Sequence, residues 1–138
     1  MSCFVLDACA LLALLRNEAG ADKVATAINA ANVDNNVRVI MNKINLLEVY
    51  YDLYRSLGKE TADNILAEIK KRPIEINANI TDEIFAEAGR LKATYKISLA
   101  DSFVLAQAIV SEGKLLTSDH HEFDHVEHKE EIAFHWIR

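Results

Sequence analysis

The chain has 138 residues and a formal net charge of −6, from 21 acidic and 15 basic side chains. About half of the residues are apolar, which is ordinary for a soluble globular protein and sufficient for one domain over residues 1–138. The acidic balance excludes binding of nucleic acid by overall charge, but not through a local patch or a metal. Cys3 and Cys9 make no disulfide framework, and we find no leader or membrane-spanning stretch, so we expect a cytoplasmic protein.

Short β-like runs alternate with longer helical patterns along the chain. We expect strands at Phe4–Leu6, Val37–Met41, Ile74–Ile76, Leu115–Thr117 and Ile132–Trp136. We expect helices over residues 9–16, 20–32, 43–57, 59–71, 81–96 and 99–111. This alternation predicts a three-layer α/β/α fold, with a mostly parallel central sheet of four to five strands and helices on both faces.

Two carboxylates come at the ends of predicted strands. Asp7 follows Phe4–Leu6 directly, and Asp119 comes shortly after Leu115–Thr117. Either side chain can serve simply as a helix N-cap or a turn residue. The carboxyl ends of parallel strands share one edge of the sheet, where α/β proteins bind ligands. If the two strands are neighbours, we expect the carboxylates to approach within the range of a shared metal ion.

A third carboxylate, Asp101, interrupts a helical pattern that is otherwise almost entirely apolar. Val104 and Leu105 lie one turn further on, and such a helix is typical of a protein interior. Ser98 and Asp101 also fit a capping box, which is a purely structural explanation. A buried carboxylate without a partner is costly, so it is protonated, paired or bound to metal, and we favour the metal.

The fourth carboxylate, Glu48, shares a helical stripe with Asn45, Asp52 and Arg55. Periodicity alone predicts a solvated helix face for this stripe. Only the company of the other three acids supports a functional role for Glu48. Because hard cations prefer oxygen ligands, the four acids together favour a site for Mg²⁺ or Mn²⁺.

Four short motifs carry a resemblance to a known family. They are the segments 4–12, 44–51, 97–102 and 116–123, and the tail 134–138 adds to them. In these motifs, and almost end to end, the chain resembles the PIN-domain nucleases. It is most similar to the VapC-type toxins of type II toxin–antitoxin systems.

The resemblance implies a PIN-like fold with an acidic pocket at the carboxyl edge of the sheet. In this family the four acids would hold one or two Mg²⁺ or Mn²⁺ ions, and the protein would cut RNA and be silenced by a cognate antitoxin. Asp7 and Asp101 would be the main ligands. Asp119 would complete the site, and Glu48 would bind a second ion or position the nucleophile.

Accessory roles are expected for three further residues. Thr117 and Ser118 carry hydroxyls that can orient a carboxylate or contact a phosphate, although both also suit a turn. Asp124 is an extra acid near the expected metal ions. Family members often carry Ser or Thr where Cys9 stands, and this substitution leaves the role of Cys9 open.

Histidines crowd the segment after Asp119. His121 and His125 have the spacing of a zinc pair on a helix, but no further ligand accompanies them. We therefore interpret the segment as a solvated polar turn, and leave open a contact of His120 or His121 with phosphate.

Partner surfaces are expected on the helices 43–57 and 59–71, which carry wide apolar faces. Such faces suit a groove for an antitoxin helix or the contact of a homodimer, as well as ordinary core packing.

Two other functions compete with the nuclease. A phosphatase of the haloacid dehalogenase type also has an Asp after its first strand, but requires a second acid where Cys9 stands. A catalytically inactive PIN-fold scaffold has no need of the acids, whereas all four are present here.

Overall fold

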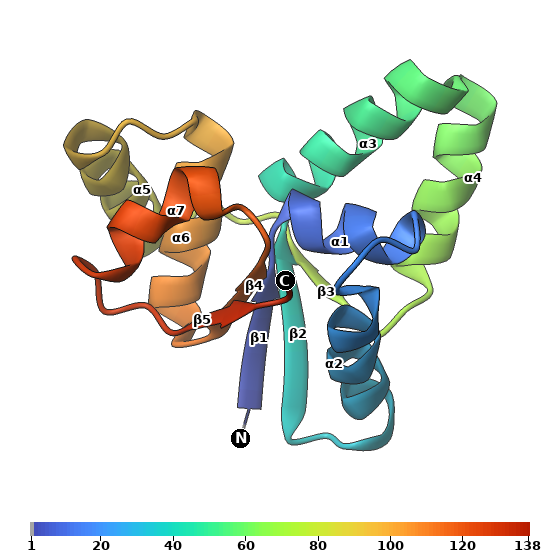
Figure 1. The fold of residues 1–138 in the computed structure, drawn as a ribbon, viewed down its shortest axis with the longest axis horizontal. Coiled ribbons are helices and arrows are strands. Elements are labelled where there is room, and N and C mark those ends of the chain that lie inside the picture. Colours follow the sequence, from blue (N-terminus) through green and yellow to red (C-terminus); the bar gives the residue numbers. More distant parts are fainter. Residues whose placement is uncertain (1) are drawn as a thin grey trace.

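A central sheet of five parallel strands organises the fold (Figure 1), seen in a computed structural model that describes residues 2–138. The strands are β1 (Ser2–Leu6), β2 (Val37–Asn42), β3 (Glu75–Asn77), β4 (Lys114–Thr117) and β5 (Phe134–Trp136). Their order across the sheet is β3-β2-β1-β4-β5, and every neighbouring pair is parallel. The prediction of a three-layer fold around a parallel sheet is confirmed.

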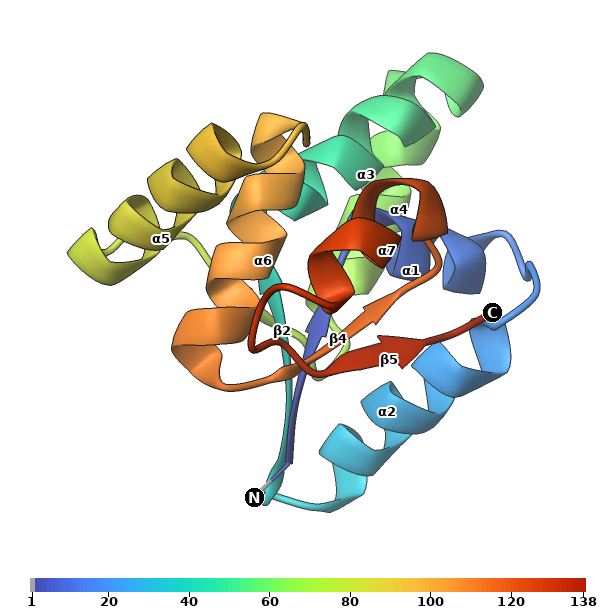
Figure 2. The ribbon, with the colours of Figure 1, turned by 60° about the vertical axis from the view of Figure 1, so that its left-hand side comes forward.

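Helices cover both faces of this sheet. They are α1 (Ala8–Leu15), α2 (Ala21–Val33), α3 (Lys43–Leu57), α4 (Lys59–Lys70), α5 (Asp82–Thr94), α6 (Leu99–Ser111) and α7 (His120–Glu127). The first four lie on one face, and α5, α6 and α7 lie on the other (Figures 1 and 2). Within residues 2–138, none of the helices combines the length and the apolar character needed to cross a membrane.

Neighbouring residues of the central strands contribute to opposite cores. Val5 and Leu115, which are paired in register, join the core beneath α5, α6 and α7. Leu6 and Leu116, the next pair, join the core beneath α1 to α4. All four are completely buried. Full burial of such a side chain stabilises the fold by about 1.5–3 kcal/mol. Because helices cover both faces of the sheet, successive residues of a strand are all buried, and the strands are continuous apolar runs without alternation.

The segment after Asp119 forms the helix α7, and the prediction of a polar turn there was wrong. The Asp119 carboxylate accepts a hydrogen bond from the backbone N–H of Glu122 at 3.1 Å and so caps the helix. Phe123 and Val126, three residues apart, are completely buried in the core beneath α7. These two contacts and the cap outweigh the weak helical preference of the histidines around them.

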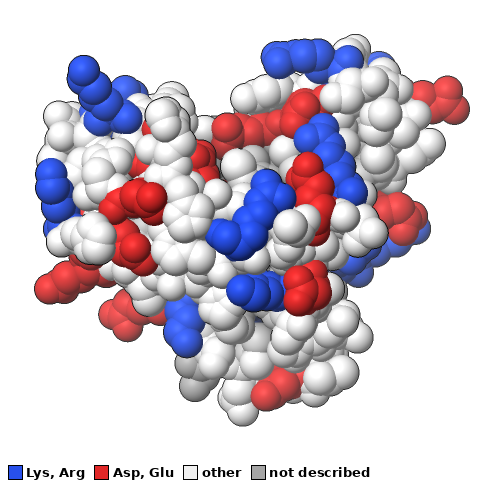
Figure 3. Space-filling view, viewed as in Figure 1, with Lys and Arg blue, Asp and Glu red and all other residues white. Residues whose placement is uncertain are grey.

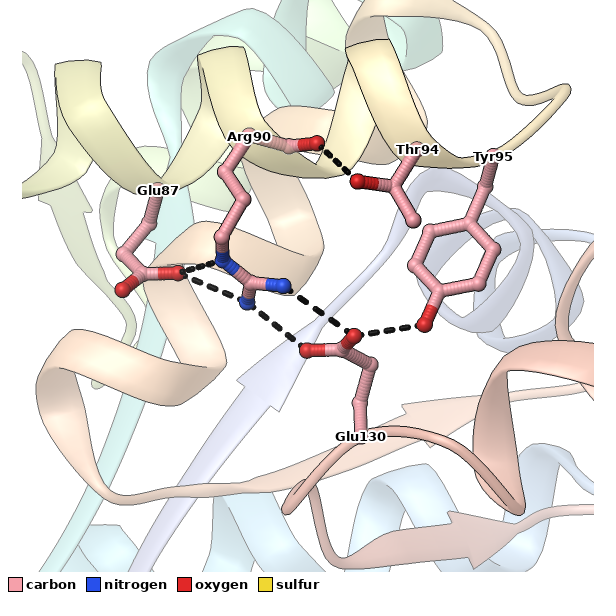
Figure 4. Close-up of polar contacts among 5 residues, drawn as sticks. All are labelled: Glu87, Arg90, Thr94, Tyr95 and Glu130. Atoms are coloured by element: carbon pink, nitrogen blue, oxygen red, sulfur yellow. Dashed lines mark hydrogen bonds and ion pairs between the residues drawn. The ribbon is translucent and has the colours of Figure 1, made fainter.

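Arg90 fastens α5 to the loop between α7 and β5 (Figure 4). Its guanidinium donates to the Glu130 carboxylate at 2.7 and 3.1 Å, and to Glu87 at 2.8 and 3.0 Å. The Tyr95 hydroxyl donates to the same Glu130 carboxylate at 2.5 Å. These contacts, Arg90 first, lower the pKa of Glu130, whose side chain is only 10% exposed. The ionised Glu130 carboxylate therefore links α5 to the loop between α7 and β5.

Candidate metal centre

The direction in which strands are added to the sheet reverses between β1 and β4. From this pair, β2 and β3 extend to one side and β5 to the other. Asp7 follows β1, and Asp119 follows β4 after one intervening residue. The two strands are neighbours, with Leu6 paired with Leu116, so the condition set for Asp7 and Asp119 to lie at the same part of the sheet edge is met. Chains diverge above such a switch point and leave the crevice in which open α/β sheets bind ligands.

Asp7 is the most deeply buried acid of the site, with only 4% of its surface exposed. One carboxylate oxygen accepts the backbone N–H of Ala10 at 2.8 Å and so caps α1, while the other accepts the hydroxyl of Thr117. Burial is the main cause that raises the pKa of Asp7, to about 7. The two hydrogen bonds oppose this shift, and the nearby charges of Asp119 and Asp101 add to it.

Glu48 and Asp101 face the same crevice from α3 and α6. Both are half-buried, and desolvation is the largest cause that raises the pKa of each. Hydrogen bonds from Asn45 and Ser98 oppose the shifts, whereas repulsion from Asp119 raises both. The predicted solvated face is found only in part: Glu48 is half-buried where Asn45 contacts α6, whereas Arg55 further along the stripe is exposed. Asp101 is less buried than its apolar surroundings suggested.

Cys9, at the start of α1, lies among all four acids. The thiol is at an exposed residue, yet desolvation by the surrounding site is the main cause that raises its pKa, to about 12. The charges of the four acids add to the shift in the order Asp7, Asp119, Asp101 and Glu48. With no cation beside it the thiol is therefore protonated at neutral pH, whereas a cysteine nucleophile requires the thiolate.

Asn45 connects α3 to α6 beside Glu48. Its side chain is buried, and its amide nitrogen donates to the backbone oxygen of Ala100 at 3.0 Å and to the Glu48 carboxylate at 3.4 Å. These acceptors fix the orientation of the amide. Its oxygen is buried and has no hydrogen-bond partner within residues 2–138, which is rare for a buried acceptor. This oxygen suits a donor from outside the chain, such as a water of a hydrated cation.

The accessory candidates lie in different places. The Thr117 hydroxyl donates to Asp7 and accepts the backbone N–H of Asp119 at 3.0 Å, so it bridges two acids. Ser118 stands between Thr117 and Asp119 in the chain and is partly exposed. Asp124 is exposed on α7 and contacts His120 at 2.7 Å. It is not among the charges that raise the pKa of Asp7, Glu48 or Asp101.

Glu122 is the acid of α7 that approaches the site. Its charge is among the causes that raise the pKa of Asp101. The sequence contains a signal for it, because Glu122 stands three residues after Asp119 in the pattern of a capped helix start. That signal is visible only once α7 is recognised as a helix.

The zinc alternative concerned His121 and His125, which both lie on α7. His121 is 93% exposed, and His125 packs edge-on against Tyr95 at 5.8 Å between ring centroids. They do not form a zinc pair.

The donor set fits a hydrated hard cation better than a ready-made cage. Among residues 2–138, no three His, Cys, Asp or Glu side chains lie close enough together to hold a metal ion as they stand. The four acids nevertheless repel one another at one edge of the sheet, and Figure 3 shows acidic side chains along the hollow between α3 and the α5–α7 layer. Mg²⁺ is usually held by a few carboxylates and several waters, which this arrangement can provide.

Comparisons with known proteins agree with this architecture. A chain of the VapBC-1 structure from nontypeable Haemophilus influenzae has a TM-score of 0.74 at 17% identity, covering 98% of both chains. A toxin–antitoxin complex from Klebsiella pneumoniae gives 0.63 at 20% identity, covering 86% of this chain and 88% of that one. VapC20 from Mycobacterium tuberculosis, described as a sarcin–ricin loop cleaving toxin, gives 0.58 at 18% identity, covering 81% and 86%.

These structural likenesses show the fold. No curated protein matches the chain significantly in sequence. The family model described as the PIN domain, however, matches residues 4–129, which is most of the chain. The chain therefore belongs to the PIN domain family.

Proposed function

We propose that this protein is a metal-dependent endoribonuclease of the VapC toxin type, which hydrolyses RNA phosphodiester bonds. The observation that carries the proposal is the convergence of Asp7, Glu48, Asp101 and Asp119 at the switch point of the sheet. The similarity to VapC20, named for cleaving the sarcin–ricin loop, supports RNA as the substrate class. Membership of the PIN domain family leaves the phosphatase alternative without support.

Asp7 and Asp101 are the principal ligands in this proposal, and Asp119 completes the site. Both oxygens of Asp7 already accept hydrogen bonds, but each carboxylate oxygen has two lone pairs, so a ligand position remains. Bound Mg²⁺ or Mn²⁺ supplies positive charge that acidifies a water and neutralises the phosphate oxygens.

Glu48 would position the attacking water in this proposal. It is half-buried, so desolvation raises its pKa, and the charges of Asp101 and Asp119, which share the site, add to this shift. The side-chain amide of Asn45 donates a hydrogen bond to the Glu48 carboxylate and so helps to orient it. The alternative role for Glu48, as a ligand of a second ion, uses the same position.

A cognate antitoxin is the partner in this proposal, supported by the similarity to a toxin–antitoxin complex. A groove of about 390 Å³ between α3 and α4 is lined by apolar side chains, among them Leu46, Leu47 and Leu66, with Lys43 and Lys70 beside them. An amphipathic helix with acidic flanks fits such a groove. Homodimer formation and a cytoplasmic location belong to the same proposal.

The test is cleavage of RNA by the wild type and by Asp7→Asn and Asp101→Asn, with Mg²⁺ or Mn²⁺ and with EDTA. We expect metal-dependent cleavage by the wild type and loss of at least a hundredfold in both variants, because charged ligands are lost. Asp82→Asn, an exposed acid in the first turn of α5, is the matched control and should cut like the wild type. Equal cleavage by all four proteins would remove the assigned site.

A further inference from the structure

An aromatic ring at the start of α7 has no part in the proposed chemistry. His120, the first residue of α7, follows Asp119 directly. Its ring stacks on Trp136 of β5, with 3.8 Å between centroids and 12° between planes. Trp136 in turn stacks on Phe134 at 5.3 Å, and Phe134 contacts the buried ring of Phe123 at 6.0 Å. The outermost ring of this stack therefore belongs to the residue that directly follows the candidate ligand Asp119 in the chain.

The ring of His120 is held in one orientation. One ring nitrogen contacts the Asp124 carboxylate at 2.7 Å, and the other contacts the backbone oxygen of Arg138 at 2.8 Å. Trp136 beneath it is also fixed, because its indole N–H donates to Glu127 at 2.9 Å. A surface that is ordered before binding costs little conformational entropy when a ligand arrives.

His120 keeps much of its side-chain surface accessible. The side chain is 48% exposed although Trp136 stacks on one face of the ring and two protein acceptors engage its nitrogens, so the opposite face is the part of the ring left for a ligand. Both ring nitrogens are already engaged with acceptors of the protein, which leaves no free N–H for a phosphate. The contact that remains available is stacking on the open face.

Positive charge lies beside this platform. The Lys23 ammonium is 3.5 Å from the backbone oxygen of Trp136, and the Arg138 guanidinium donates to the backbone oxygen of Ala19 at 3.2 Å. Figure 3 shows Lys and Arg side chains on this face, around the position where Figure 1 places the C-terminus. In a chain with an acidic net charge, these are local cations able to meet a nucleic-acid backbone.

We propose that the open face of His120 is a stacking platform for one base of a single-stranded nucleic acid, with Lys23 and Arg138 beside its phosphates. The inference rests on the proposed ribonuclease function and adds a contact that holds the substrate next to the acids. Single-stranded RNA is recognised largely by stacking of splayed bases on aromatic rings, and such contacts tolerate different sequences.

The test uses Trp136, the only tryptophan of the chain, as a fluorescent reporter. A short ribo-oligonucleotide is titrated in EDTA, where no cleavage is expected, alongside an oligonucleotide of equal length with abasic sugars. We expect His120→Ala to weaken binding of the intact RNA about tenfold, in line with the loss of one base–aromatic stack. His120→Phe should keep most of the affinity. The neighbouring His121→Ala, at a residue 93% exposed, is the matched control and should bind like the wild type.

The abasic oligonucleotide separates stacking from other roles of His120. We expect it to bind the wild type about tenfold more weakly than intact RNA and to show no further loss with His120→Ala. Equal losses for both oligonucleotides would show a phosphate or structural role and overturn the inference. Equal binding of both by the wild type also overturns it, even if no His120 variant folds. In either case metal-dependent cleavage can persist, so the proposed function stands, whereas absence of all RNA binding and cleavage removes both.

Discussion

The hydroxyl of Thr117 donates a hydrogen bond to the buried carboxylate of Asp7, across the boundary between β4 and β1. The same oxygen accepts the backbone N–H of Asp119 at 3.0 Å. One hydroxyl thus fixes two acids that arrive on different strands. Groups behind metal ligands of this kind orient the ligands and tune their basicity.

Replacement of Thr117 by valine keeps the shape and removes the hydroxyl. We predict that Thr117→Val weakens Mn²⁺ binding about 10–100-fold in calorimetry. Its free energy of unfolding in urea should be lower by about 1–2 kcal/mol, because the buried Asp7 carboxylate loses a hydrogen-bond donor. Thr26→Val is the control and should change neither quantity appreciably, because Thr26 is exposed on α2 and its hydroxyl donates only to the backbone oxygen of Asp22. Undiminished Mn²⁺ affinity in Thr117→Val would refute the role of this hydroxyl.

The stability of the metal-free protein should depend on pH through Asp7. Burial raises the pKa of Asp7 in the folded state to about 7, from an ordinary value of 3.8. Between these values the folded state binds more protons than the unfolded state, so the free energy of unfolding falls as pH rises through this window. Asp7→Asn cannot ionise, and we predict that it is more stable than the wild type at pH 8 by about 2–4 kcal/mol.

Urea unfolding in EDTA from pH 4 to pH 8 measures this difference. Saturating Mn²⁺ should reverse it, because the cation stabilises the folded wild type and has little affinity for Asp7→Asn. Asp22→Asn, an exposed acid of α2, should follow the wild type throughout. Parallel stability curves for wild type and Asp7→Asn would show that ionisation of Asp7 carries no cost in the fold.

Asn45 should matter to the site more than to the core. Asn45→Leu removes the hydrogen bonds to Glu48 and to the backbone oxygen of Ala100. We predict that it weakens Mn²⁺ binding about tenfold, as expected for a group that orients a ligand. Gln107→Met is the control, because Gln107 is also buried, and its side-chain hydrogen bonds go to Asn42, Asn77 and Ser111 instead of the acids. If both variants bind Mn²⁺ alike at similar stability, Asn45 has no special role.

The Arg90 contacts of Figure 4 should stabilise the protein without affecting the site. Arg90→Met leaves the nearly buried carboxylate of Glu130 without its cation, and we predict a loss of about 1–3 kcal/mol at pH 7. Arg38→Met breaks an exposed pair with Glu75 and should cost less than about 1 kcal/mol. Chemical denaturation measures the free energy of unfolding of both variants. A larger loss of stability for Arg38→Met than for Arg90→Met would contradict the stabilising role of the Arg90 contacts.

The sheet and its two strand-end acids were predictable because the physical rule is local. Apolar runs followed by Asp7 and Asp119 occur where parallel strands end, and parallel strands end at one edge. The position of Asp101 was indicated by an otherwise apolar helix. How deeply each acid is buried was not predictable, because burial depends on how α1, α3 and α6 pack at that edge.

The surroundings of Glu48 and Glu122 could not be predicted from the sequence. The polar stripe of Glu48 has the periodicity of a solvated face, and only packing of α3 beside α6 turns it toward the other acids. Glu122 was missed, and Asp124 preferred, because the segment was taken for a turn. Once a helix begins at His120, Glu122 falls in its first turn near Asp101, while Asp124 lies one turn from His120 and contacts it.

The most direct test of the central claim is calorimetric titration of Mn²⁺ into the metal-free wild type and into Asp7→Asn at pH 7. Because the pKa of Asp7 is about 7, the cation should displace protons, and the heat should vary with the ionisation enthalpy of the buffer. We predict saturable binding with proton release by the wild type, and its loss in Asp7→Asn. Absence of binding by the wild type, or identical binding by both proteins, would contradict the assignment of these acids as a cation site.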